Sequence, residues 1–131
     1  MTDQTAFKLA VVAPVLPITD MARSLAYYTG PLMFTVGFEW TEGEAGQIDY
    51  AIIQQGDVEL HLARAPAPRK TAAYVFVDKV DAFFAAVQAK GAQIAHAIAD
   101  QPWEMREFEV IDPDGNALIF GEHLSRLKPA H

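Results

Sequence analysis

The sequence predicts an α+β fold in which two tandem β-α-β-β-β units form a curved sheet shaped like a cup. The chain has 131 residues, the size of a single domain, and 51% of them are hydrophobic, which is enough to build a core. Each half of the chain follows the same order: an apolar strand-like run, a helix and three further strand-like runs. One amphipathic helix covers only one face of a short sheet, so two such units are expected to share a core. We therefore expect one domain over residues 1–131, with modules at about 7–64 and 71–124.

The first unit opens with an apolar strand over Leu9–Ile18, which is rich in β-branched residues. A helix is predicted next, over Met21–Thr29. Thr19 or Asp20 can cap its start, and the Gly30-Pro31 pair ends it. Three strands are expected to follow, at Phe34–Trp40, Asp49–Gln54 and Val58–Ala63.

The second unit repeats this order of elements and has its own residues that begin and end the helix. Its first strand is predicted over Ala72–Val77, and Asp78 is expected to cap the helix that follows. Val80 and Val87 share the apolar stripe of this helix, which the Lys90-Gly91 pair closes. The last three strands are expected at Gln93–Ile98, Met105–Ile111 and Ala117–Gly121.

The charge and the composition exclude several classes of function. With 17 acidic and 10 basic residues the net charge is -7, which repels nucleic acid and anionic membranes and favours a cationic ligand. The absence of cysteine removes disulfides, thiolate metal sites and cysteine nucleophiles, and it fits a reducing cytoplasm. The apolar run near the N-terminus is too short to span a bilayer. We expect a cytoplasmic protein without nucleic-acid or membrane partners.

Four motifs carry a resemblance to a known family over nearly the whole chain. They are Ala13-Pro14-Val15-Leu16, Tyr27-Tyr28-Thr29, Gly56-Asp57-Val58-Glu59-Leu60, and the run from Asp100-Gln101-Pro102-Trp103 through Arg106-Glu107-Phe108 to Asp112-Pro113-Asp114-Gly115-Asn116. The sequence resembles the vicinal-oxygen-chelate superfamily of glyoxalases, extradiol dioxygenases and antibiotic-resistance proteins. Within it, the chain is most similar to the bleomycin-resistance proteins. One departure is Met33, where such proteins usually carry glycine.

Enzymes of this superfamily hold a divalent metal through one ligand from each of four strands. The resemblance matches these positions to Ala13, Glu59, Ala72 and Ile119. Alanine and isoleucine cannot coordinate a metal, so we expect no metal, no cofactor and no catalytic residue. By strand alternation His61 lies on the same face as Glu59, and the pair either contacts a ligand or forms part of a metal site. The first interpretation is favoured, because two residues of one strand supply too few ligands.

The candidate ligand-binding residues are mainly aromatic. The resemblance matches Phe38 and Trp103 to the two aromatic residues between which bleomycin-resistance proteins hold the planar bithiazole of the drug. Trp103 lies in a polar, proline-containing segment, which favours exposure over a place in the core. Phe38 can equally belong to a buried strand face, and Trp40 shares its face. Tyr74 is expected either to occupy the cup or to pack in the core. His61 and Glu59 complete the candidate set.

The resemblance also implies a homodimer in which two chains exchange the N-terminal strand around Pro14 and bind ligands in grooves between the subunits. Pro14 suits such a hinge, because proline cannot donate to a strand ladder. The leading hypothesis is metal-independent binding and sequestration of a cationic, planar-aromatic antibiotic of the bleomycin family. The first alternative is a metal-dependent enzyme of the same superfamily, of the glyoxalase, dioxygenase or thiol transferase type. The second is a binding module for another small hydrophobic metabolite, which the sequence alone does not separate from the first hypothesis.

Overall fold

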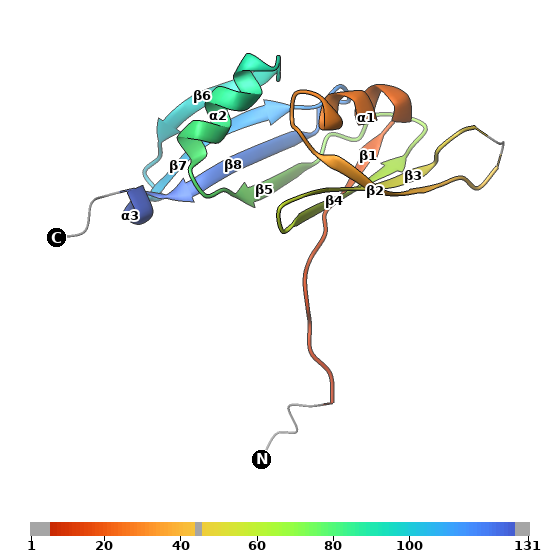
Figure 1. Cartoon of the computed structure of the whole chain (residues 1–131), viewed down its shortest axis with the longest axis horizontal. Coiled ribbons are helices and arrows are strands. Elements are labelled where there is room, and N and C mark those ends of the chain that lie inside the picture. The colour runs from red at the N-terminus through yellow and green to blue at the C-terminus, as the bar shows by residue number, and fades with distance from the viewer. Residues whose placement is uncertain (1–5, 44–45, 128–131) are drawn as a thin grey trace.

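The computed structural model describes residues 6–43 and 46–127, and it confirms the α+β class (Figure 1). The elements of the first half are β1 (Val15–Ile18), α1 (Met21–Thr29), β2 (Thr35–Trp40), β3 (Tyr50–Gln55) and β4 (Val58–Arg64). Those of the second half are β5 (Ala72–Phe76), α2 (Val80–Ala89), β6 (Ile94–Asp100), β7 (Met105–Ile111), β8 (Ala117–His123) and the short α3 (Leu124–Leu127). Within the described residues, no helix is long and apolar enough to cross a membrane.

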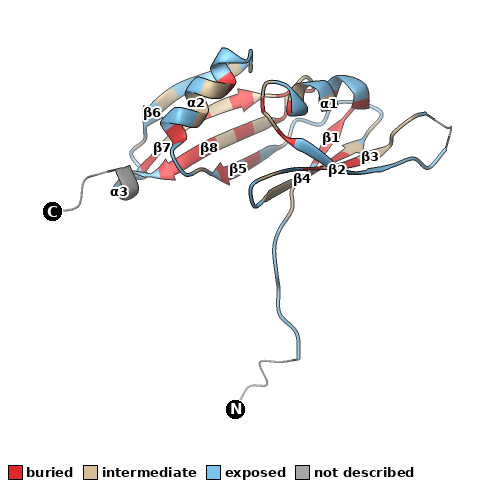
Figure 2. Ribbon diagram, in the orientation of Figure 1, coloured by how far each residue is buried: buried red, intermediate tan, exposed pale blue. Residues whose placement is uncertain are grey.

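The strands form two four-stranded sheets with the same connectivity. Their orders are β1-β4-β3-β2 and β5-β8-β7-β6, and in each sheet the first strand lies parallel to its neighbour while the other pairs are antiparallel. A helix covers one side of each sheet (Figure 1), and buried residues recur along the inner strands (Figure 2), alternating with less buried ones in β3 and β5. We call the other side of each sheet its open face.

The N-terminal strand is shorter than predicted. The prediction of a strand over Leu9–Ile18 is wrong for residues 9–14, because β1 begins only at Val15. Pro14 stands immediately before it and has no N–H for a strand ladder. Residues 6–12 instead extend away from both sheets (Figure 1). Their large apolar side chains are 85–92% exposed: Phe7, Leu9, Val11 and Val12.

The two long helices are capped in different ways. Asp20 caps α1 as predicted, since its carboxylate accepts a hydrogen bond of 3.1 Å from the N–H of Arg23. The predicted cap of α2 at Asp78 is wrong. The carboxylate of Glu122, from distant β8, accepts hydrogen bonds from the N–H groups of Lys79 at 3.2 Å and Val80 at 3.0 Å. Glu122 is 5% exposed, so a buried charge holds the start of α2 on the second sheet.

A buried polar network joins the two halves of the chain. The hydroxyl of Tyr28, in α1, donates a 2.9 Å hydrogen bond to Asp112, in the turn between β7 and β8. Asn116 donates from its side chain to the carbonyl oxygen of Pro17 at 2.8 Å. Asp112 also accepts from the N–H groups of Asp114 and Asn116, at 2.9 Å each, which closes the turn. This Asp-Pro-Asp-Gly-Asn turn, which ends the longest motif of the family resemblance, therefore ties α1 and the residues of β1 to the second sheet.

A bulge in β2 decides which way Phe38 points. Val36 pairs with the buried Ile53, but Phe38 pairs with Ile52, so the register shifts at Gly37. Without the bulge, simple alternation would place Val36 and Phe38 on the same side. With it, Phe38 lies on the open face and is half-exposed. The interpretation of Phe38 as a buried core residue is wrong for this reason.

Candidate functional site

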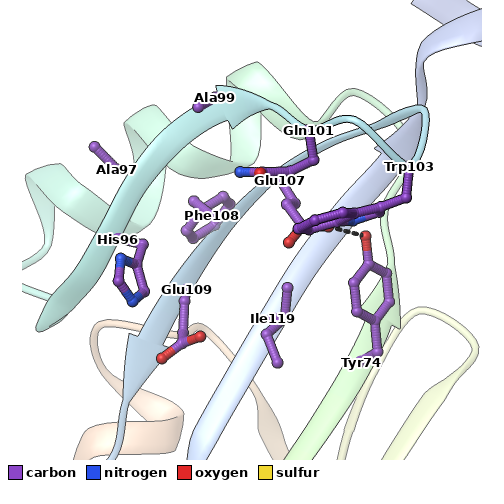
Figure 3. A pocket seen from close by; sticks show the side chains of 10 residues that line it. All are labelled: Tyr74, His96, Ala97, Ala99, Gln101, Trp103, Glu107, Phe108, Glu109 and Ile119. Atoms are coloured by element: carbon purple, nitrogen blue, oxygen red, sulfur yellow. Dashed lines mark hydrogen bonds between the residues drawn. The ribbon is translucent and has the colours of Figure 1, made fainter.

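A pocket of about 680 Å³ lies on the open face of the second sheet (Figure 3). Its lining comes from β5, β6, β7, β8 and the turn between β6 and β7. The lining residues are Tyr74, His96, Ala97, Ala99, Gln101, Trp103, Glu107, Phe108, Glu109 and Ile119. Two of the residues predicted from the sequence, Tyr74 and Trp103, thus belong to one pocket.

Trp103 stands on a tight turn at the mouth of the pocket. The N–H of Gln101 donates a 2.7 Å hydrogen bond to the carbonyl oxygen of Met105, and Glu104 takes the left-handed backbone conformation with φ at 65°. The indole is 60% exposed, which excludes a place in the core. Its N–H donates a 3.0 Å hydrogen bond to Glu107, so the ring is exposed and yet held in one orientation.

Arg106 anchors this turn from the other side of the sheet. Its guanidinium forms ion pairs with Asp81 of α2 at 2.9 Å and with Asp100, the last residue of β6, at 2.8 Å. The hydrogen bonds from Arg106 hold the pKa of Asp81 below its usual range. The helix, the end of β6 and the start of β7 are therefore tied together on both sides of Trp103.

Tyr74 and Glu107 meet across the strand that separates them. The Tyr74 hydroxyl donates a 2.8 Å hydrogen bond to the same Glu107 oxygen that Trp103 contacts. Burial and the neighbouring Glu107 raise the pKa of Tyr74. Gly121 of β8 lies under this bond, and a Cβ atom there would stand 2.8 Å from Cζ of Tyr74. The contact between Tyr74 and Glu107 thus requires glycine at position 121.

The floor of the pocket is acidic. Glu107 and Glu109 alternate along β7, and both point to the open face. Glu109 stands opposite His96 in the register of β7 against β6. No lysine or arginine is among the lining residues. Glu107, Glu109 and His96 were not among the sequence-predicted candidates, although the alternation of the two glutamates within Met105–Ile111 was a signal for them. An acidic floor beneath an exposed indole suits a cationic aromatic molecule.

The other four predicted residues lie on the open face of the first sheet. They are Phe38, Trp40, Glu59 and His61, and the rings of Phe38 and Trp40 are 50% and 46% exposed. His61 contacts Glu59 through Nε2 at 2.9 Å and Tyr50 through Nδ1 at 2.6 Å. The hydrogen bond from His61 lowers the pKa of Glu59. Tyr50 was missed from the sequence, because only the register of β3 against β4 brings it to His61.

The residues at the superfamily's metal positions do not fit a metal. Ala13, Ala72 and Ile119 carry no donor atom, and the carboxylate of Glu59 is hydrogen-bonded to His61. In the described part of the chain, no three residues of the His, Cys, Asp and Glu types are grouped so that they could hold an ion. The pair of Glu59 and His61 is accordingly a hydrogen-bonded pair that faces the open side of the sheet.

Fold and site together define a small two-sheet protein with aromatic, acidic open faces. Residues 8–120 match the model of the Glyoxalase/Bleomycin resistance protein/Dioxygenase superfamily, and the chain belongs to this superfamily. It is 28% identical to the bleomycin resistance protein of Geobacillus stearothermophilus over 134 residues, which cover 85% of this chain and 95% of the relative.

Solved structures with bound drug are similar to this chain as well. A bleomycin-binding protein complexed with bleomycin has a TM-score of 0.72 and 25% identity, and the match covers 88% of this chain and 99% of that one. The bleomycin-binding protein from bleomycin-producing Streptomyces verticillus, complexed with copper(II)-bleomycin, has a TM-score of 0.73 and 26% identity. That match covers 87% of this chain and 96% of the other. The resemblance inferred from the motifs is thereby confirmed.

Proposed function

We propose that this protein binds and sequesters a cationic, planar-aromatic antibiotic of the bleomycin family and does not alter it chemically. The observation that carries the proposal is the exposed indole of Trp103, held by Glu107 at the mouth of an acidic pocket of about 680 Å³. A planar heteroaromatic ring stacked on an indole gains on the order of 0.5–1.5 kcal/mol beyond the area it buries. The relatives named for bleomycin resistance or bleomycin binding support the choice of ligand.

We further propose that the binding form is a homodimer that exchanges its N-terminal segments around Pro14. The apolar side chains of residues 7–12 extend away from the body of the chain, and both open faces carry exposed aromatic rings. A second copy would cover these surfaces, which are larger than scattered exposed apolar residues. In such a dimer, Phe38 and Trp40 of one subunit would face a ligand stacked on Trp103 of the other.

The test is calorimetric titration of metal-free bleomycin in buffer that contains EDTA. We expect saturable binding to the wild-type protein without added metal, and recovery of the drug with unchanged mass. Trp103→Ala should weaken binding tenfold or more, because the stacking face is lost. Trp103→Phe is the matched control and should retain most of the affinity. Equal affinities of the wild-type protein and Trp103→Ala, or no saturable heat with either, would refute the proposal and favour a different small hydrophobic ligand.

A further inference from the structure

A smaller pocket, of about 340 Å³, lies on the helix-covered side of the second sheet, where the two halves of the chain meet. We call it the Phe83 crevice, after the residue of α2 that lines it. Ile119 and Phe120 are neighbours on β8 and point to opposite sides of the sheet. Ile119 lines the Trp103 pocket on the open face, and Phe120 lines the crevice. The second sheet therefore separates the two sites.

The crevice is open because the turn between β3 and β4 is short. Gln55 pairs directly with Val58. Gly56 and Asp57 are thus the whole turn, which lies beside the end of β5 (Figure 1). The corresponding turn of the second half, residues 112–116, is longer, and its side chains form hydrogen bonds with α1 and with β1. The space that the longer turn fills against the first half is left open by the shorter turn against the second half.

The interior of the crevice is a preformed aromatic surface. The rings of Phe83 and Phe120 pack edge to face with their centroids 4.9 Å apart, and Phe120 also stacks on Phe108 at 5.4 Å. Phe34 adds a buried ring from the first half of the chain, and the buried Val75 adds an aliphatic side chain from β5. These side chains are held by the core, so an apolar group can enter without rearrangement of the protein.

The mouth of the crevice carries two carboxylates. Asp57, in the turn, and Asp78, after β5, are both exposed, and none of the ion pairs in the described part of the chain involves either of them. Glu122 caps α2 in place of Asp78, which leaves the Asp78 carboxylate available. Lysine and arginine are absent from the lining, and Lys79, although next to Asp78 in the chain, is not part of it. The mouth therefore attracts positive charge.

We propose that the Phe83 crevice binds a small organic cation with an apolar body, of the arylalkylammonium class. The apolar body packs against the rings of Phe83 and Phe120 and leaves water. The ammonium group stays at the exposed mouth near Asp57 and Asp78, where it keeps part of its hydration and gains the attraction of both carboxylates. No lining residue of the crevice belongs to the Trp103 pocket, so this site goes beyond the proposed function.

Three probes with the same phenyl group and different charge test this site by methyl NMR of the full-length protein. They are 2-phenylethylammonium, 2-phenylethanol and 3-phenylpropanoate. Val58, Val75 and Val77 line the crevice, so their methyl signals report on it directly. We expect the ammonium probe to shift these signals to saturation and to bind about fivefold more tightly than the alcohol, with the carboxylate weakest. Added salt should narrow these differences. Equal affinities of the ammonium probe and the alcohol, or unchanged valine signals, would overturn the proposal.

Two sets of variants locate the bound probe. Asp57→Asn combined with Asp78→Asn keeps the shape of the mouth and should remove the preference for the ammonium probe, while the affinity for 2-phenylethanol stays the same. A preference that survives in this variant refutes the role of the carboxylates. Val58→Phe narrows the crevice and should abolish the binding of both probes, and thermal unfolding checks that each variant is folded.

Two further measurements separate this site from the other proposals. Trp103→Ala should weaken bleomycin and leave the probe affinity at the three valines unchanged. If bleomycin fails to bind but the valine signals respond as expected, the proposed antibiotic function falls and the crevice site stands, and the reverse pattern removes the crevice site alone. A nuclear Overhauser effect between the ring of Phe83 and Leu9 of a second copy would show that the N-terminal segment fills the crevice, and it would overturn the proposal.

Discussion

Replacement of Gly121 by alanine tests how the Trp103 pocket is built. Gly121 lies on β8, between the strands that carry Tyr74 and Glu107. An added Cβ atom would stand 2.8 Å from Cζ of Tyr74 and 3.2 Å from Cβ of Glu107. The methyl group therefore occupies the space over which Tyr74 reaches Glu107, and the phenol ring must move away.

The size of the effect follows from what the displaced ring loses. The bond of Tyr74 to Glu107 joins a hydroxyl to a carboxylate, a type that contributes roughly 1.5–3 kcal/mol when it is well buried. Tyr74 is partly exposed, so its hydroxyl regains water when it moves, and we expect a net loss of about 1–2 kcal/mol in the free energy of unfolding. Glu107 keeps only its bond to Trp103, and bleomycin affinity should fall about threefold to tenfold.

Urea unfolding of four proteins makes this prediction quantitative. They are the wild type, Gly121→Ala, Tyr74→Ala and the double variant. If the clash with Tyr74 is the cause, Gly121→Ala should cost much less stability when Tyr74 is already alanine, and the cycle should show a coupling near 1 kcal/mol. The same cost in both backgrounds would show that the loss of stability at position 121 does not come from Tyr74, and the reasoning would fail.

Three other changes have outcomes that the structure specifies. Glu122→Ala should lower the free energy of unfolding by about 1–3 kcal/mol in urea, because the N–H groups of Lys79 and Val80 at the start of α2 lose their acceptor, and Glu122→Gln should recover part of it; an unchanged midpoint contradicts this. Burial and the nearby charge of Asp112 raise the pKa of Tyr28, so folding favours the neutral phenol. This contribution is fully present below the unfolded pKa of about 10 and is lost as the pH rises above it. Urea unfolding between pH 8 and 11 should therefore show a decline that is shallower in Tyr28→Phe, and parallel curves would speak against it. Arg106→Lys should weaken bleomycin binding several-fold, because the turn that carries Trp103 loses its two-sided anchor, while the melting temperature changes little, as expected for an exposed ion pair. Equal affinity would show that the ion pairs do not position the turn.

Local sequence signals predicted the elements well wherever the deciding contacts are local. Helix α1 runs over the predicted Met21–Thr29, because its cap at Asp20 and its end at Gly30 lie next to the residues they control. The strand over Met105–Ile111 was also predicted with its observed bounds. Where a remote group decides, the local signal misled: Asp78 has the chemistry of a cap, yet Glu122 reaches α2 from a strand far along the chain.

The residues of the candidate site also fall into those that local sequence predicted and those that only the packing of strands brought together. Composition and local pattern were sufficient to place Trp103 on an exposed turn and to identify the alternation of Glu59 and His61. The chain alone could not show that Trp103 bonds to Glu107, because that partner follows from how the indole packs over neighbouring strands.

Residue types, helix caps and strand periodicity are properties of neighbours along the chain, so the order of elements followed from them directly, whereas the superfamily came from the resemblance of four motifs. Which side chains share a pocket depends on register, and a shift of one residue moves a side chain to the other face of a sheet. The bulge at Gly37, which turns Phe38 to the open face, and the pairing of β3 with β4, which brings Tyr50 to His61, were therefore decided only when the strands came together.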